Sequence, residues 1–448
     1  MALTGLDIYK KLPKTNCKEC GLPTCLAFAM KVAAGGASLD QCPKLGADAR
    51  DALGEASAPP QRLVKLGPDA GAVEVGQETV LFRHDERFHR PTAVALTISD
   101  NAETGAIRAA CEDFKKLQFL RVGQTLRPDM IALLHESGSA EKFVAAAGAV
   151  REALGVPMVL VSPDRQALSA AATGPLAGQR PLLYCSGPST VDELAALANA
   201  AKAPICVAGS IDEVAAAVEA LAKAGVKDVL ISPGPAAAAG TLTFLTQTRR
   251  AALRKKFRPL GCPVLVVAAG GEDKMASALD ACAFVCKYAA VVVTDAWAPH
   301  LLVPILTSRQ NIYTDPQKPV QVEAKLYDVG EVSPASPLLV TTNFSLSYYS
   351  VEAEVEAARV PCRILAVPTE GTSVLTAWAA DKFNPQTIAA ALKASGADQK
   401  AAHHKLVIPG HVAVIAAELA EESGWQVLVG PKEASGIGPF LKNEPALR

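Results

Sequence analysis

Four cysteines near the start of the chain are the residues whose type and spacing point most directly to chemistry. Cys17, Cys20, Cys25 and Cys42 follow the pattern C-x2-C-x4-C-x16-C, and Pro43 comes directly after the last of them. Thiolates bind soft metals, and one close pair with a third cysteine and a distant fourth suits a loop that wraps an iron-sulfur cluster. We therefore expect these four cysteines to hold a metal centre.

Zinc is the main competitor, because it also takes four thiolates. Its sites usually pair two C-x2-4-C knuckles, and only one close pair occurs here. A helix over residues 26–34 is predicted between the third and fourth cysteines, since Leu26, Met30 and Ala33 recur at helical spacing. This layout favours a four-iron cluster over zinc, and four structural thiols remain the third possibility.

The whole-chain composition limits the function classes. The chain has 448 residues, and its net charge of -1 does not favour a nucleic acid or a membrane surface as partner. The seven other cysteines lie mostly in apolar contexts, which is typical of buried thiols in a reducing cytosol. The N-terminus lacks an apolar signal region, and no apolar run reaches the ~18 residues of a membrane span. We expect a soluble cytoplasmic protein of two or three domains.

The middle of the chain has an α/β rhythm. A Pro- and Ala-rich tether is predicted from Leu45 to Leu63, followed by a short strand pair before Asp85 that could plug one end of the next domain. Eight strand candidates then alternate with Ala-rich helices. The candidates are Thr92 to Ile98, Met130 to His135, Pro157 to Ser162, Pro181 to Ser186, Pro204 to Ala208, Asp228 to Ser232, Cys262 to Ala268 and Ala289 to Thr294.

Eight strand-helix units predict a TIM-like (β/α)8 barrel. Thr190 with Glu193, and Ser210 with Glu213, form capping boxes that mark helix starts directly after strands. A doubly wound sheet would also give this alternation, so it stays open as the alternative.

A second boundary is expected where prolines crowd between Tyr313 and Pro337. Four short strands alternate with helices after it, which predicts a doubly wound, Rossmann-like domain. The fold class is thus α/β, with a cluster domain at 1–58, a barrel at 59–312, a linker at 313–336 and the last domain at 337–448.

The strand ends of the last domain carry small and hydroxyl residues beside helix starts, so that amides and hydroxyls converge on one sheet edge. Such an edge can hold a large, amide-rich ligand, because ligands of open α/β sheets bind beyond the carboxyl ends of the strands. A mononucleotide is an alternative, although neither common phosphate-binding motif occurs, and ordinary loops are another.

In this order the parts resemble the large subunit of the corrinoid iron-sulfur protein of anaerobic acetyl-CoA synthesis, over the whole chain. NCKECGLPTC and DQCPK resemble that family's four-iron four-sulfur motif, and TTNFSLSYYS with PTEGTSVLTAW resembles its C-terminal corrinoid domain. The resemblance implies a [4Fe-4S] cluster and a B12-type cobamide. By position, the cobamide would contact Val340, Thr341, Thr342, Leu346, Glu370, Gly371, Thr372, Ser373, Glu433, Ala434 and Gly436.

The resemblance also implies a methyl carrier rather than a catalyst with side chains in chemical roles. Co(I) would accept the methyl group of methyltetrahydrofolate from a methyltransferase, and methyl-Co(III) would donate it to acetyl-CoA synthase. The cluster would reduce inactive Co(II) to Co(I). A small subunit, the methyltransferase and acetyl-CoA synthase/CO dehydrogenase are the implied partners. No histidine stands in the D-x-H-x-x-G pattern, so a cobalt without a protein imidazole is expected.

Two other function classes remain. One is an iron-sulfur electron-transfer subunit without a corrinoid. The other is a barrel methyltransferase that binds a pterin at its strand ends, where Glu272, Asp273, Asp295 and His300 are the polar candidates. Acids at strand ends more often cap helices, so we assign these four residues no role.

Overall fold

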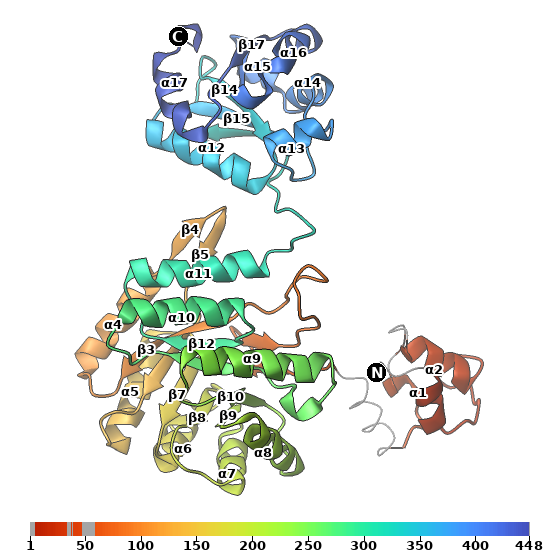
Figure 1. Ribbon diagram of the computed structural model, residues 1–448, viewed down its shortest axis with the longest axis vertical. Helices are drawn as coiled ribbons and strands as arrows, with labels where there is room; N and C mark the ends of the chain where they lie inside the picture. The colour runs from red at the N-terminus through yellow and green to blue at the C-terminus, as the bar shows by residue number, and fades with distance from the viewer. Residues whose placement is uncertain (1–4, 34–36, 38, 47–58, 448) are drawn as a thin grey trace. The chain divides into compact units, whose positions relative to one another are not determined.

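The computed structural model describes residues 5–33, 37, 39–46 and 59–447. The chain divides into two compact units, one of Met1–Gln118 with Arg127–Tyr313 and the other of Phe119–Leu126 with Thr314–Arg448 (Figure 1). The tether predicted at Leu45 to Leu63 falls largely outside the described residues. The predicted domain boundaries stay a prediction. No helix in the described ranges is long and apolar enough to cross a membrane.

The N-terminal segment consists of α1 (Gly5–Lys11), α2 (Cys25–Ala33) and η1 (Leu39–Gln41). The α2 helix buries Cys25, Phe28 and Ala29. Leu26 and Met30, whose spacing predicted the helix, lie on its exposed face. The helix was therefore predicted correctly, but from residues that do not form its buried side.

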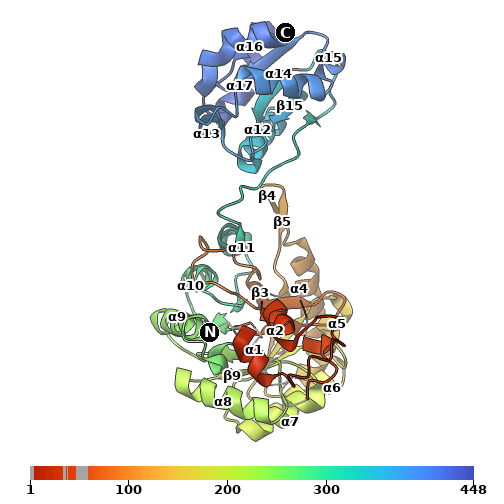
Figure 2. The ribbon, with the colours of Figure 1, turned by 90° about the vertical axis from the view of Figure 1, so that its right-hand side faces the viewer.

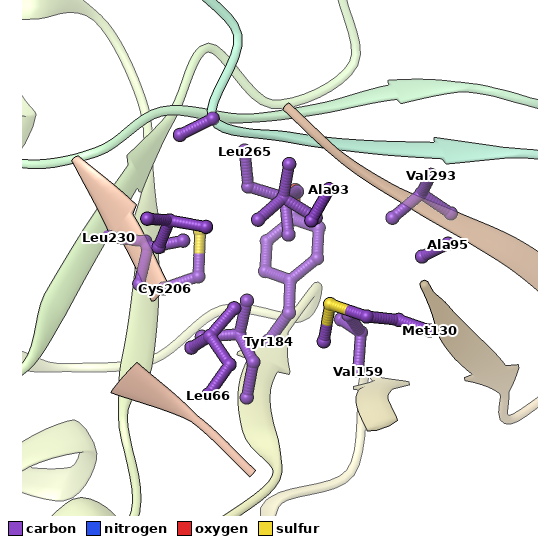
Figure 3. Packing of buried hydrophobic residues seen from close by; sticks show 14 of the residues in the cluster. Leu66, Ala93, Ala95, Met130, Val159, Tyr184, Cys206, Leu230, Leu265 and Val293 are labelled. Atoms are coloured by element: carbon purple, nitrogen blue, oxygen red, sulfur yellow. The ribbon is translucent and has the colours of Figure 1, made fainter. Parts of the chain in front are cut away.

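The predicted strand pair is the antiparallel β1 (Leu63–Leu66) and β2 (Val73–Gly76). Val64, Leu66 and Val75 share one core with the first inward-facing residues of the barrel strands. Figure 3 shows Leu66 beside Tyr184 and Cys206 in this core. The pair thus plugs the amino-terminal end of the barrel, as the sequence suggested.

Eight parallel strands form the barrel, in the order β10-β9-β8-β7-β6-β3-β12-β11. A parallel bridge between Ile231 and Val264 joins β10 to β11, so the sheet closes on itself and the doubly wound alternative for this region is wrong. All eight predicted strands are present. They are β3 (Ala93–Ser99), β6 (Met130–Leu134), β7 (Met158–Ser162), β8 (Leu182–Cys185), β9 (Ile205–Ala208), β10 (Val229–Ser232), β11 (Leu265–Ala268) and β12 (Val291–Thr294).

Helices form the outer ring of the barrel (Figure 2). Both predicted capping boxes are present, because the Thr190 and Ser210 side chains accept from the amides of Glu193 and Glu213, whose carboxylates bond back. The ring consists of α4 (Thr104–Lys116), α5 (Ala140–Ala153), α6 (Arg165–Thr173), α7 (Val191–Ala201), α8 (Ile211–Lys223), α9 (Ala238–Leu253), α10 (Lys274–Cys286) and α11 (Pro299–Tyr313), with η2 (Arg258–Leu260) after α9.

The sequence did not predict the hairpin of β4 (Phe119–Arg121) and β5 (Gln124–Leu126). Its two-residue turn places both Val122 and Gly123 at positive φ, the type I′ geometry of tight hairpins. Position 122 is Val rather than the Asn or Asp that usually marks such a turn, so the sequence pattern did not predict the hairpin.

The last unit contains a five-stranded sheet in the order β13-β15-β14-β16-β17. Four strands are parallel, namely β14 (Leu338–Thr342), β15 (Cys362–Val367), β16 (Lys405–Ile408) and β17 (Gln426–Val429). Separate apolar cores lie on the two faces of the sheet, as a doubly wound domain requires. The helices are α12 (Ser345–Ala358), α13 (Val374–Ala379), α14 (Pro385–Ala394), α15 (Ala397–Lys400), η3 (Gly410–Ile415), α16 (Ala416–Ser423), η4 (Ala434–Gly436), α17 (Ile437–Asn443) and η5 (Pro445–Leu447).

The segment predicted as a linker contains β13 (Leu326–Val329), an antiparallel edge strand paired with β15. Before it, the Val322 amide donates to the Asn343 carbonyl at 2.9 Å, and the Ser345 amide donates to the Val320 carbonyl at 2.9 Å. The chain is therefore bonded to the last domain from Val320 onward. The irregular stretch after α11 is reduced to residues 314–319.

Candidate cofactor sites

Asn16 and Cys25 form two hydrogen bonds with each other at the start of α2. The Cys25 amide donates to Asn16 Oδ1 at 2.8 Å, and the Asn16 amide donates to Cys25 Sγ at 3.4 Å. Asn16 takes a positive φ, as does Gly21 in the turn that follows Cys20. Backbone amides aimed at sulfur are what a cluster-binding loop supplies, because they stabilise charge on the thiolate.

All four cysteines lie in this segment. Cys25 and Cys42 are buried in the core of α1 and α2, and Cys20 packs against it. Cys17 is partly exposed, and hydrogen bonds from the Glu19 backbone and the Thr15 side chain lower the pKa of its thiol.

The donor set and the amide-to-sulfur bond fit a soft metal cluster. Within the described residues, however, no three His, Cys, Asp or Glu side chains form a ligating group. The structure supports the segment as a candidate cluster site without giving its coordination.

A cavity of about 340 Å³ opens beyond the carboxyl ends of β14, β16 and β17. The strand order places β14 beside β16. The connection from β14 leads to β15 on one side and the connection from β16 leads to β17 on the other, so a topological switch point lies between β14 and β16. β14 and β16 pair only at Leu339 and Val407, so their carboxyl ends are free to diverge. The cavity is lined by Leu339, Val340, Thr341, Phe344, Leu346, Ser347, Ser350, Val351, Ser373, Val374, Val407, Ile408, Pro409, His411, Gly430, Pro431, Lys432, Glu433, Ala434 and Ile437.

Asn343 ties the loops at this edge together. Its buried Oδ1 accepts from the amides of Thr369 and Gly371, at 3.0 and 3.1 Å, and from the Thr369 hydroxyl at 3.1 Å. Its Nδ2 donates to Gln321 Oε1 at 2.9 Å. One amide side chain thus joins the loop after β14, the loop after β15 and the segment before β13. The sequence gave Asn343 no role, although it stood within a loop that was singled out.

The cavity brings together six of the eleven residues predicted to contact a ligand: Val340, Thr341, Leu346, Ser373, Glu433 and Ala434. The other five, Thr342, Glu370, Gly371, Thr372 and Gly436, do not line it. Thr342 is fully buried, and the Glu370 carboxylate forms an ion pair with Lys382. The Thr372 hydroxyl donates to the Thr369 carbonyl at 2.7 Å.

The backbone at Gly371 is closely packed against other parts of the chain. Its φ is +72°, and an added Cβ would lie 2.6 Å from Gln321 Cγ and 3.0 Å from Pro319 Cβ. The resemblance placed Gly371 among the residues expected to contact the cobamide. The space beside it is filled by the chain that leads into β13.

His411 also lines the cavity. Its Nε2 lies 3.8 Å from Glu433 Oε1, so the pair spans the loops after β16 and β17. The signal was available, because Pro409 to His411 is a strand end. The elements that begin at the cavity also expose four large apolar side chains, those of Leu346, Leu375, Trp378 and Val414. We call these four residues the apolar rim.

Two of the polar residues at the barrel strand ends bind neighbouring groups of the barrel itself. Asp273 caps α10 by accepting from the Met275 and Ala276 amides, and Asp295 is bound by Lys274 at 2.6 Å. The helix-cap interpretation of Asp273 is confirmed.

A closed parallel barrel, a four-cysteine segment and an open α/β domain with a cavity at its switch point together define a modular protein with more than one candidate cofactor site. A family model described as CO dehydrogenase/acetyl-CoA synthase delta subunit matches residues 63–441, and a model for an Fe-S cluster segment matches residues 12–44.

Two full-length relatives show the family. The corrinoid/iron-sulfur protein large subunit of Moorella thermoacetica is 44% identical over 445 residues, with 99% of each chain covered. The acetyl-CoA decarbonylase/synthase complex subunit gamma of Methanothermobacter thermautotrophicus is 33% identical, with 98% of this chain and 99% of that one covered. The chain belongs to this family of corrinoid/iron-sulfur protein large subunits and acetyl-CoA decarbonylase/synthase gamma subunits.

Among solved structures, a dihydropteroate synthase from Coxiella burnetii matches 56% of this chain and all of its own, at 13% identity and a TM-score of 0.41. At that level the likeness says nothing about function.

Proposed function

We propose that the chain is a methyl carrier that holds a [4Fe-4S] cluster on Cys17, Cys20, Cys25 and Cys42 and a cobamide on its last domain. The carrying observation is the cavity at the β14/β16 switch point, where open α/β sheets bind ligands. Relatives over the full chain are named for a corrinoid and an iron-sulfur centre, which supports both cofactors.

The size of the cavity limits how much of the ligand it could hold. Cavities of roughly 300–1,000 Å³ hold drug-sized molecules. A cobamide is much larger, so the 340 Å³ cavity would hold only part of it, and the apolar rim would supply apolar contacts for the remainder. Thr341, Ser347, Ser350 and Ser373 supply hydroxyls for the polar groups of the inserted end.

When bound, the cobamide would supply a cobalt that takes a methyl group from methyltetrahydrofolate on a separate methyltransferase and gives it to acetyl-CoA synthase. The cysteine segment would hold the cluster that returns oxidised cobalt to its active state. This chain's residues bind and position the two centres, and none of them acts on the methyl group.

The proposed partners are a small subunit that completes a heterodimer, the methyltransferase, and acetyl-CoA synthase/CO dehydrogenase. The name of the archaeal relatives, which describes a subunit of a complex, supports partner subunits. None of the eleven cysteines, all of which the structure describes, forms a disulfide bond, which supports a location in the cytoplasm of an anaerobe.

Metal analysis of the anaerobically purified heterodimer tests the proposal. We expect cobalt near one and iron near four per heterodimer, in line with one cobamide and one four-iron cluster. Replacement of Cys20 by Ala should remove the four-iron form while cobalt content stays the same, because the two sites lie in separate parts of the chain. Iron without cobalt in the unaltered protein would favour an electron-transfer subunit instead.

A further inference from the structure

Residues 320–322, which lead toward β13, run beside the loop that follows β14, and we call them the strap. Gln321 in the strap forms an antiparallel bridge with Phe344 in that loop. The Val322 amide donates to the Asn343 carbonyl at 2.9 Å. The strap directly follows the irregular stretch of residues 314–319, so it is the first part of the chain after α11 that is bonded to the last domain.

The strap also completes the start of α12. The N-cap residue of this helix is Phe344, whose side chain offers no acceptor, so the amides of the first turn need another partner. The Val320 carbonyl is such a partner, because the Ser345 amide donates to it at 2.9 Å. The first turn of α12 carries Leu346 and Ser347 into the lining of the cavity. The strap therefore fixes an element that shapes the cavity.

The side chain of Gln321 reaches the loop after β15 as well. Its Oε1 accepts from Asn343 Nδ2 at 2.9 Å, and Asn343 Oδ1 accepts in turn from the Gly371 amide at 3.1 Å. Its Cγ packs on Gly371, where an added Cβ would lie 2.6 Å away. This second loop leads to Ser373, which lines the cavity. Gln321 thus holds both loops, although it does not itself line the cavity.

Gln321 lies on the surface, whereas the two residues that it contacts, Asn343 and Gly371, are buried. An exposed glutamine contributes little to a core, so its replacement leaves the packing of the domain in place. The contacts of Gln321 instead decide how two loops of the cavity are arranged, and a ligand site depends on such supporting contacts.

We propose that Gln321 is a positioning residue for the cobamide: through the strap it holds the loops after β14 and β15 in the arrangement that receives the ligand. The inference deepens the proposed function and rests on it. The strap also separates the cavity from the hinge region before it, so that the last domain can move without loosening the loops. By linkage, a ligand that requires this arrangement must in turn hold the strap in place.

Binding of hydroxocobalamin to the heterodimer freed of its corrinoid tests the inference. Gln321→Ala removes the acceptor for Asn343 and the contact with Gly371, so the dissociation constant should rise by about tenfold. Gln321→Glu keeps an acceptor at the same reach and should stay within about twofold of the unaltered protein. Gln399→Ala, which removes an exposed glutamine from α15 of the same domain, is the matched control and should leave the dissociation constant unchanged.

Hydrogen exchange on the same samples separates positioning from a general loss of stability. In the unaltered heterodimer, bound hydroxocobalamin should slow the exchange of the Val322 and Ser345 amides, which bond across the strap, by about tenfold. In Gln321→Ala this slowing should be lost, while the amides of β14 and β16 stay protected.

Three results would overturn the inference although the cobamide binds. They are an unchanged affinity of Gln321→Ala, strap amides that do not respond to hydroxocobalamin in the unaltered protein, and a loss of protection in β14 and β16 of Gln321→Ala, which would show a merely structural role. If the unaltered heterodimer bound no hydroxocobalamin, the proposed function itself would be wrong.

Discussion

Single side chains organise both candidate sites. Asn16 uses its side chain and its own amide to fix Cys25, so one short polar residue sets the entry of α2 and directs an N–H at sulfur. In the last domain, His411 stands at the rim of the cavity with Glu433 on the neighbouring loop. Histidine is a common axial ligand of metal cofactors, so the role of His411 bears directly on the expectation that no protein imidazole binds cobalt.

Replacing His411 with Gln tests that expectation. If His411 only links two loops, the variant should keep its corrinoid content within about twofold, because an exposed pair of this kind contributes little to stability. The Co(II) form should also keep its electron paramagnetic resonance spectrum. A changed nitrogen splitting in the variant would show that His411 binds cobalt, and the prediction of a histidine-free cobalt would then be wrong.

At the scale of elements, the sheet edge of the last domain depends on loops that are far apart in the sequence. β14 and β15 pair over five residues, whereas β14 and β16 pair at one position, and the opening between their ends is the cavity. Asn343 holds this edge in shape from a buried position. Its bonds to Thr369, Gly371 and Gln321 keep three segments in register.

Replacing Asn343 with Ala should destabilise the last domain by about 2–4 kcal/mol, because several buried amides and an acceptor lose their partner. Urea unfolding followed by the fluorescence of Trp378 and Trp425 measures this loss. Asn343→Asp is the matched variant, since it keeps an acceptor for Thr369 and Gly371 and loses only the donor to Gln321. It should be less destabilised than Asn343→Ala. Equal stability of Asn343→Ala and the unaltered chain would contradict this role.

At the scale of the whole molecule, one cobalt would have to meet a cluster and two separate enzymes in turn. The irregular stretch of residues 314–319 between α11 and Val320 is short and contains Pro316 and Pro319. We therefore place the hinge for any domain motion there rather than across the whole of 313–336.

Deleting Asp315 to Lys318 should lower methyl transfer with at least one partner by about tenfold, because the shortened hinge restricts the reach of the last domain. Corrinoid content should stay unchanged. Replacing the same four residues with Gly and Ser of equal length is the control and should preserve transfer to both partners. Separate assays with the methyltransferase and with acetyl-CoA synthase check this, and undiminished transfer by the deletion variant would rule out the hinge.

Local signals were enough for much of the fold. Several features are signalled by a few neighbouring residues. They are the spacing of Cys17, Cys20, Cys25 and Cys42, the capping boxes at Thr190 and Ser210, and each of the eight barrel strands. Each depends on short-range physics: ligand reach, first-turn amides and the periodicity of burial. The two capping boxes and the number of barrel strands were predicted correctly, and the four cysteine ligands stay a prediction.

Features that depend on distant partners were visible only in the tertiary structure. β13 is a strand because its backbone pairs with β15, and the buried face of α2 was decided by its packing on α1. The cavity exists because strand order brings β14 next to β16. The chain before β13 packs Gln321 and Pro319 beside Gly371. The cofactors were predicted from the sequence, through the cysteine spacing and the family resemblance. The pairing of remote strands decided where the last domain opens to receive one, since register and neighbours are set by contacts far apart in the chain.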